Sequence, residues 1–276
     1  MKLPISLRRS CATMAKTVLI TGGSSGIGLA AAEAFQNAGC RVYTLSRSMA
    51  KTPAKLHLCA DVTDEASIRN ALEMVCSREG RLDILVNCAG FGISGATEFT
   101  SSMEAEKQFR VNFFGTVNAC KAALPLMRAQ GGGRIVNVSS VAAPVAIPFQ
   151  TFYSASKAAI NSYTAALANE VRPFGISVTA VQPGDICTGF TAAREKSFQG
   201  DDVYEGRIAR SVARMERDEK NGMPPSRVGR FLCRVALKRR VKPLYTVGFS
   251  YRCVCLLCKL LPCAAMNRIV GLLYAK

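Results

Sequence analysis

The stretch Thr17-Val18-Leu19-Ile20-Thr21-Gly22-Gly23-Ser24-Ser25-Gly26-Ile27-Gly28 decides the fold of this 276-residue chain. A short apolar run leads into a glycine-rich turn, and an alanine-rich helical pattern follows at once. Glycine permits the positive φ and the close backbone approach that a phosphate needs, and the helix that follows offers free N–H groups. Glycines also make ordinary turns, but the position between a strand and a helix predicts a dinucleotide-binding site.

Outward from this turn, short apolar runs alternate with longer helical patterns. Strands are predicted at 17–21, 41–45, 56–60, 83–87, 134–139, 176–182 and 243–248. Helices are predicted at 26–38, 64–79, 103–127, 151–172, 203–220 and 226–238. Such alternation implies right-handed crossovers, and the near-continuous apolar strands fit a sheet that is covered on both sides. We therefore predict an α/β, doubly wound Rossmann fold: a single domain with a mainly parallel seven-stranded sheet and helices on both faces.

The chain divides into a central domain and two atypical ends. Residues 1–13 precede a complete domain start; we expect a disordered tail, with a weak targeting segment or a start codon placed too early as alternatives. Residues 14–250 form the predicted catalytic domain, in which 190–225 is a charged, mobile substrate loop region. Residues 251–276 are a basic amphipathic segment.

Charge and cysteine content limit the function classes. The net charge is +17, yet residues 226–276 hold eleven basic residues and no acid, whereas the middle of the chain is nearly neutral. This distribution argues against nucleic-acid binding by the core and favours an anionic partner for the C-terminal end. Twelve scattered cysteines are typical of reduced thiols in a cytoplasmic protein. The single histidine, His57, and the irregular cysteine spacing after 252 argue against a metal site.

The end of the second strand bears on the choice of nicotinamide cofactor. The strand ends in Ser46-Arg47, and no acid stands between Cys40 and Pro53. An acid at this place usually binds the ribose hydroxyls of NAD, whereas an arginine accommodates a 2′-phosphate. The alternative is a solvated surface arginine. The missing acid favours NADP(H) as the cofactor.

Tyr153 and Lys157 stand four residues apart in a helical pattern and so share one helix face. A nearby ammonium lowers the pKa of a phenol, which would let Tyr153 exchange a proton with a substrate oxygen. Taken alone, the pair also fits an ordinary helix surface. Ser140 ends a strand thirteen residues upstream, at the edge of the sheet where α/β proteins bind ligands.

The spacing of Gly22, Gly26 and Gly28, followed by Ser140 and by Tyr-x-x-x-Lys, resembles the classical short-chain dehydrogenase/reductase family. The matching motifs occur in the family's order over residues 17–188. The resemblance implies that Ser140, rather than Ser139, binds the substrate oxygen, and that Asn112 orders a water next to Lys157. It assigns catalysis to Asn112, Ser140, Tyr153 and Lys157. It assigns cofactor binding to Gly22, Ser24, Ser25, Gly26, Ile27, Gly28, Arg47, Asp61, Val62, Asn87, Ala89, Gly90, Tyr153, Lys157, Pro183, Gly184, Ile186 and Thr188.

The expected reaction interconverts a carbonyl and an alcohol on a small lipophilic molecule, because the loop over 142–149 is wholly apolar. The C-terminal part resembles members acting on steroids, retinoids or acylated dihydroxyacetone phosphate. Two alternatives are a 3-oxoacyl thioester reductase and a non-catalytic NADP(H)-sensing protein. The segment 252–276 either lies on an anionic membrane or packs on the domain or a partner subunit. We expect a cytoplasmic homo-oligomer, a dimer or tetramer.

Overall fold

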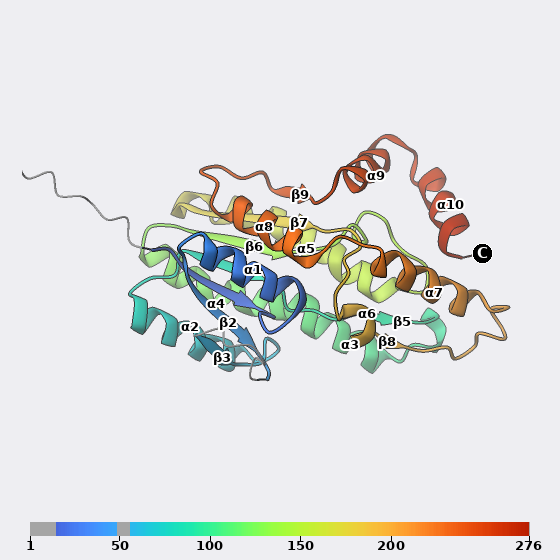
Figure 1. Ribbon diagram of the computed structural model, residues 1–276, viewed down its shortest axis with the longest axis horizontal. Helices are drawn as coiled ribbons and strands as arrows, with labels where there is room; N and C mark the ends of the chain where they lie inside the picture. The colour runs from blue at the N-terminus through green and yellow to red at the C-terminus, as the bar shows by residue number, and fades with distance from the viewer. Residues whose placement is uncertain (1–14, 49–55, 276) are drawn as a thin grey trace, which may run out of the picture.

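The computed structural model describes residues 15–48 and 56–275 (Figure 1). Within these residues the central sheet has seven parallel strands in the order β3-β2-β1-β4-β6-β7-β9. Their bounds are β1 Thr17–Thr21, β2 Arg41–Ser46, β3 His57–Cys59, β4 Ile84–Asn87, β6 Gly133–Val138, β7 Ile176–Gln182 and β9 Leu244–Thr246. The strand order reverses between β1 and β4, which confirms the predicted doubly wound sheet and places a ligand crevice at that point.

Helices cover both faces of the sheet, as predicted (Figure 1). One face carries α1, Gly26–Asn37, and α8, Pro225–Ala236; the other carries α2, Glu65–Glu79, α4, Gly115–Ala129, and α5, Thr151–Glu170. The side chains of β1 alternate between the two layers, because successive side chains of a strand point to opposite faces. Leu19 packs into the α2–α4–α5 layer, whereas Val18 and Ile20 pack into the α1–α8 layer.

The prediction of one continuous helix over 103–127 is wrong, because the segment is interrupted by a wider turn. The chain forms α3, Ser102–Phe109, then a π-helical turn over Arg110–Phe114, and only then α4. The Thr116 hydroxyl donates to the Asn112 carbonyl at 2.9 Å, and Gly115 lies so close to Val62 that a Cβ would come within 2.7 Å of it. The wide turn brings Asn112 into the interior, where π turns commonly accompany functional sites.

Residues 190–225 carry more structure than the single helix predicted there. The region contains α6, Phe190–Ala193, the short strand β8, Glu195–Lys196, and α7, Arg207–Lys220. Strand β8 pairs with β5, Ile93–Ser94, in a second sheet of two strands. Helix α7 begins four residues later than predicted, because Gly206 has a φ of +76° and stands outside the helical region. Short 3₁₀ turns lie at Thr97–Phe99 and Arg172–Phe174.

The C-terminal segment forms two helices, α9, Phe249–Leu260, and α10, Cys263–Tyr274. Pro262 separates them, because proline has no N–H to continue the first helix. The domain boundary predicted at residue 250 falls inside α9. Helix α10 packs against α7 (Figure 1). In the described part of the chain no helix is long and apolar enough to cross a membrane. The predicted extension over 1–13 lies outside the described residues.

Candidate active site

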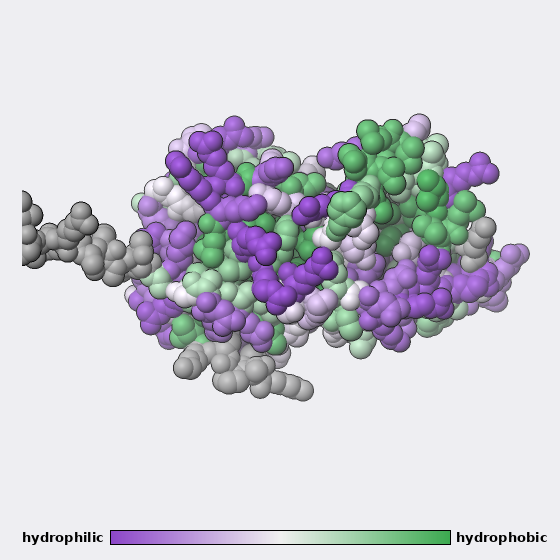
Figure 2. Space-filling view, turned by 45° about the horizontal axis from the view of Figure 1, so that its top comes forward, coloured by the Kyte–Doolittle hydropathy of each residue, from purple (hydrophilic) through white to green (hydrophobic). Residues whose placement is uncertain are grey.

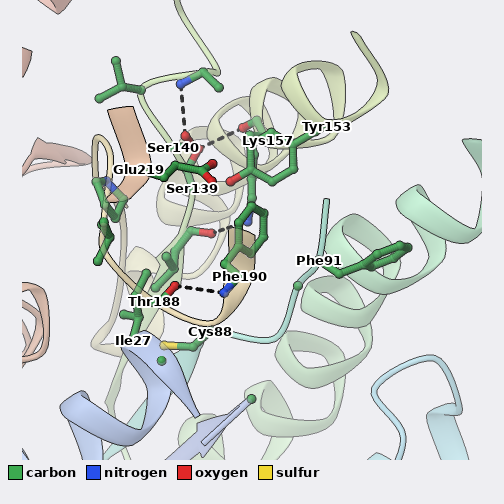
Figure 3. A pocket seen from close by; sticks show the side chains of 18 of the residues that line it. Ile27, Cys88, Phe91, Ser139, Ser140, Tyr153, Lys157, Thr188, Phe190 and Glu219 are labelled. Atoms are coloured by element: carbon green, nitrogen blue, oxygen red, sulfur yellow. Dashed lines mark hydrogen bonds between the residues drawn. The ribbon is translucent and has the colours of Figure 1, made fainter. Parts of the chain in front are cut away.

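A cavity of about 820 Å³ opens at the carboxyl ends of the central strands. The glycine turn after β1 lines one end of the cavity, the loop after β6 and helix α5 line its middle, and α9 and α10 line the other end. Parallel strands bring all these segments to one edge of the sheet, which is where open α/β sheets bind ligands. The cavity therefore joins most of the predicted site residues in one space (Figure 3).

The glycine turn has the shape that a pyrophosphate requires. Gly22 has a φ of +68°, and a Cβ on Gly28 would lie 2.2 Å from the Gly22 carbonyl oxygen. Only glycine fits such a cradle. Ser25 is extended ahead of α1, and no side chain caps the helix, so its first N–H groups face the cavity. The predicted residues Gly22 and Ser24 to Gly28 all line the cavity, and they fit a dinucleotide.

At the adenosine end, Arg47, Asp61 and Val62 line the cavity as predicted. One carboxylate oxygen of Asp61 is already engaged within the protein, because it accepts from the Thr63 N–H at 2.8 Å and from the Thr63 hydroxyl at 2.9 Å. Arg47 is exposed at the carboxyl end of β2. The preceding residue, Ser46, is neutral, and its hydroxyl donates to the Ser48 carbonyl at 2.7 Å. This end of the cavity is suited to a negative group.

The reacting groups come from α5 and the end of β6. Tyr153 and Lys157 both line the cavity, and the Lys157 ammonium lies 5.6 Å from the centre of the Tyr153 ring. The structure distinguishes the two adjacent serines (Figure 3). The Ser139 hydroxyl donates to the Lys157 carbonyl at 3.0 Å, whereas the Ser140 hydroxyl interacts with the Tyr153 phenol and lowers its pKa. Ser140 is therefore placed beside the phenol, where the sequence predicts it.

The electrostatics of the pair differ from the expectation. Burial raises the pKa of Tyr153 to about 12, and the Ser140 hydroxyl and the Arg194 guanidinium offset this only in part. Burial also lowers the pKa of Lys157 to about 8. Contrary to the prediction, Lys157 does not contribute to the pKa of Tyr153; its ammonium donates to the Val138 carbonyl at 3.0 Å. The phenol thus stays protonated at neutral pH, which is the state of a proton donor.

Two predicted asparagines lie behind the cavity and do not line it. The Asn112 amide donates to the Phe91 carbonyl at 3.0 Å and to the Ser156 hydroxyl at 3.2 Å. Its oxygen and the Lys157 ammonium lie on the same side of Gly90, since a Cβ at that glycine would be 3.1 Å from the oxygen and 3.6 Å from the ammonium nitrogen. Asn112 is thus next to Lys157, held by the π turn.

The second asparagine, Asn87, is a correction to the predicted cofactor contacts. Its amide donates to the Asn137 side chain at 2.9 Å and so joins β4 to β6 beneath the cavity. It is buried and braces the sheet, while the following Ala89 and Gly90 do line the cavity. The buried amide pair links two neighbouring central strands, and Asn87 does not line the cavity to which its cofactor contact was assigned.

At the nicotinamide end, Pro183, Gly184, Ile186 and Thr188 line the cavity as predicted. Sequence reasoning missed Phe190, whose ring lies 5.7 Å from the Tyr153 ring, and the carboxylates of Asp185 and Glu219. It also missed the apolar wall made by α9 and α10: Val254, Leu257, Met266, Ile269, Val270 and Leu273. The spacing of these apolar residues by three, four and seven was the available signal.

Comparisons with known proteins agree with this geometry. Residues 16–198 match the family model described as short chain dehydrogenase. The chain is 43% identical over 243 residues to a 3-ketodihydrosphingosine reductase of Bacteroides thetaiotaomicron, covering 84% of this chain and 90% of that protein. It is 31% identical to a probable short-chain type dehydrogenase/reductase of Helicobacter pylori, over 88% and 92% of the two chains. A solved short-chain dehydrogenase from Streptomyces avermitilis superposes with a TM-score of 0.80 at 30% identity, over 90% and 93%.

Proposed function

The chain belongs to the short-chain dehydrogenase family, and on that premise we propose that it is an NADP(H)-dependent reductase of a long-chain lipid ketone. Membership of the family makes the chain an oxidoreductase that acts between carbonyl and CH–OH groups with a nicotinamide cofactor. The observation that supports a long-chain lipid ketone as the substrate is the continuity of a single cavity. It leads from the dinucleotide cradle, past Tyr153 and Ser140, into an apolar chamber under α9 and α10.

The chain's own residues account for proton transfer and orientation. A bound nicotinamide supplies the hydride for the carbonyl carbon. Tyr153 donates the phenol proton to the carbonyl oxygen, and Ser140 donates a hydrogen bond that steadies the charge developing on that oxygen. Lys157 donates to the Val138 carbonyl with its ammonium 5.6 Å from the centre of the Tyr153 ring, where it would contact the bound cofactor. Phe190 packs on the tyrosine and helps to exclude water.

NADP(H) rather than NAD(H) is supported by the charge at the end of β2. Arg47 lines the cavity and the described part of that strand end, residues 41–48, contains no acid. A guanidinium can bind a 2′-phosphate in bidentate fashion, and a carboxylate would repel it. Arg47 is therefore the residue that we assign to cofactor choice.

The substrate is assigned from the walls of the chamber and from one relative. An apolar chamber next to a phenol and a serine suits a ketone that carries a long alkyl chain. The 43% identical relative is named for 3-ketodihydrosphingosine, a lipid of that kind. A long-chain keto lipid is thus the best-supported substrate class. Steroids, retinoids, acyl dihydroxyacetone phosphate and 3-oxoacyl thioesters are the competitors to be tested against it.

The outer surface of α9 and α10 supports contact with an anionic membrane. Figure 2 shows a hydrophobic patch over these helices, where Phe249 is 79% exposed and Leu260 70%. Residues 249–275 contain three basic residues and no acid. Anionic lipid attracts such a surface. Since the inner faces of both helices line the chamber, this contact would also bring lipid close to the site. The homo-oligomer and the cytoplasmic location stay predictions.

The test is a cofactor-coupled screen. Loss of NADPH absorbance would be followed with 3-ketodihydrosphingosine, a ketosteroid, retinal, acyl dihydroxyacetone phosphate and a 3-oxoacyl thioester. We expect the highest kcat/KM with the long-chain keto lipid. A higher value with any of the other four would replace the substrate assignment, and NADPH binding without turnover of all five would support the non-catalytic alternative.

A further inference from the structure

Two carboxylates lie in the cavity close to the reacting phenol. Asp185 follows β7 in the loop that borders the nicotinamide end, and Glu219 belongs to the last turn of α7. Figure 3 shows the Glu219 side chain directed toward Ser140 and Tyr153. Both carboxylates raise the pKa of Tyr153, which places their charges near its hydroxyl. Neither the reduction step nor a neutral apolar ketone needs a negative charge here.

Glu219 already has its partners within the protein. One of its oxygens pairs with Arg194, which is only 4% exposed, and the other accepts from the Thr191 hydroxyl at 2.6 Å. A carboxylate compensated in this way is a structural link between α6 and α7. It has little remaining capacity to attract a cation from the substrate.

The direct side-chain partner of Asp185 is a neutral hydroxyl. The Tyr251 hydroxyl of α9 donates to its Oδ2 at 2.7 Å. In the described part of the chain no lysine, arginine or histidine forms an ion pair with it. Burial raises the pKa of Asp185 and the nearby Asp218 carboxylate raises it further, while the Tyr251 hydroxyl and the more distant Arg194 guanidinium offset part of this rise. A partly buried carboxylate without an ion-pair partner is costly, and a positively charged ligand in contact with it would relieve that cost.

We propose that Asp185 binds an ammonium group carried by the substrate next to its reacting carbonyl. The inference rests on the proposed reduction of a long-chain keto lipid at the same site. The carbonyl faces Tyr153 and Ser140, the neighbouring amine faces Asp185, and the alkyl chain follows the apolar wall. Tyr251, which holds the carboxylate, belongs to the same helix as Val254 and Leu257 of that wall. The site therefore selects an amphipathic amino ketone.

The same carboxylate also acts against other lipids. A neutral ketone such as a steroid would cover Asp185 without supplying a cation, and the more deeply buried charge would then gain no new partner. A 3-oxoacyl thioester likewise offers no cation next to its ketone, and acyl dihydroxyacetone phosphate would bring a negative phosphate toward Asp185. Asp185 thus gives the cavity a preference that its apolar walls cannot give, since apolar walls discriminate weakly among hydrocarbons.

The test compares Asp185→Asn with wild type on two substrates, 3-ketodihydrosphingosine and the same ketone without its amino group. Asparagine keeps the shape and still accepts from Tyr251, but it removes the charge. We expect kcat/KM for the amino ketone to fall on the order of tenfold to a hundredfold, as for loss of a charged hydrogen bond. The value for the deaminated ketone stays within about twofold. Asp202→Asn is the control, because Asp202 is exposed and does not line the cavity.

A binding measurement separates this proposal from the proposed reaction. Quenching of bound NADPH fluorescence would report binding of sphinganine and of the matched alcohol without the amine. Tight sphinganine binding that Asp185→Asn abolishes supports the amine site even where neither ketone is reduced, and then only the reaction is wrong. Reduction of both ketones with equal kcat/KM supports the reductase and overturns the amine site. Equal losses on both substrates, or no amine preference in binding, also overturn it.

Discussion

Arg47→Ala isolates the charge that we assign to cofactor choice. Arg47 is exposed, so its attraction for a phosphate is that of charges in water, about 1 kcal/mol per pair of unit charges at about 4 Å. A phosphate monoester carries close to two negative charges, which gives about 2 kcal/mol, or roughly thirtyfold in affinity. NADPH should therefore bind the variant about thirtyfold more weakly, while NADH, which has no 2′-phosphate, binds as before.

Arg41→Ala provides the matched control on the same strand. Arg41 stands at the other end of β2 and pairs with Glu79 at 3.0 Å. Six strand residues separate the two ends by roughly 20 Å, well beyond the Debye length of about 8 Å at physiological salt. The control removes the same charge from the chain but should leave both cofactor affinities within about twofold, since the effect is screened.

Calorimetric titration of NADPH and NADH into the three proteins, at low and high salt, measures this effect. The NADPH advantage of wild type should shrink as salt rises, because the attraction is solvent-exposed. Equal affinities of wild type for both cofactors would refute the assignment. So would an Arg47→Ala protein that loses NADH and NADPH affinity alike, or an Arg41→Ala protein that loses as much as Arg47→Ala.

Three further perturbations test the reaction, the buried lysine and the membrane surface. Tyr153→Phe should lose about a thousandfold or more in kcat with NADPH affinity within twofold, because the hydroxyl acts in the transition state; near wild-type turnover would remove the assigned proton donor. Lys157→Met should abolish activity yet raise the free energy of unfolding by about 2 kcal/mol at pH 7. Burial lowers the pKa of Lys157 from 10.5 to about 8, so removing the buried charge stabilises the fold by about 3 kcal/mol. Loss of the hydrogen bond to the Val138 carbonyl offsets about 1 kcal/mol of that gain. This gain in stability over wild type should shrink from pH 8 toward pH 10.5, because in that range Lys157 of wild type is neutral when folded and still protonated when unfolded. Urea unfolding measures the difference; a less stable variant, or a gain that grows with pH, would contradict the prediction. The protein should co-sediment with anionic vesicles at low salt and dissociate from them as the salt concentration rises, whereas neutral vesicles should bind little of it. The double variant Leu256→Ser, Leu260→Ser should bind anionic vesicles about tenfold more weakly, because both leucines are exposed. Unaltered binding by the double variant would place the contact elsewhere.

Local patterns sufficed for most of the fold and for the cofactor end of the site. A glycine at 28 is required by the backbone of its own turn, and the near-continuous apolar run of β1 indicates burial on both faces of the sheet. Tyr153 and Lys157 share a helix face through their spacing alone. In each case the physical cause lies within a few residues of the signal, so the sequence by itself determined the sheet, the nucleotide cradle and the reacting pair.

Tertiary structure decided whatever depended on contacts between distant segments. The π turn at Asn112 comes from packing against Val62 and Phe91, which no helical pattern records. The phenol pKa is set by burial rather than by Lys157, whose ammonium donates to a strand carbonyl. The basic C-terminal end was ambiguous as a sequence. Folding sets Tyr251 against Asp185, 66 residues apart, and turns one apolar strip into both the wall of the chamber and an exposed surface.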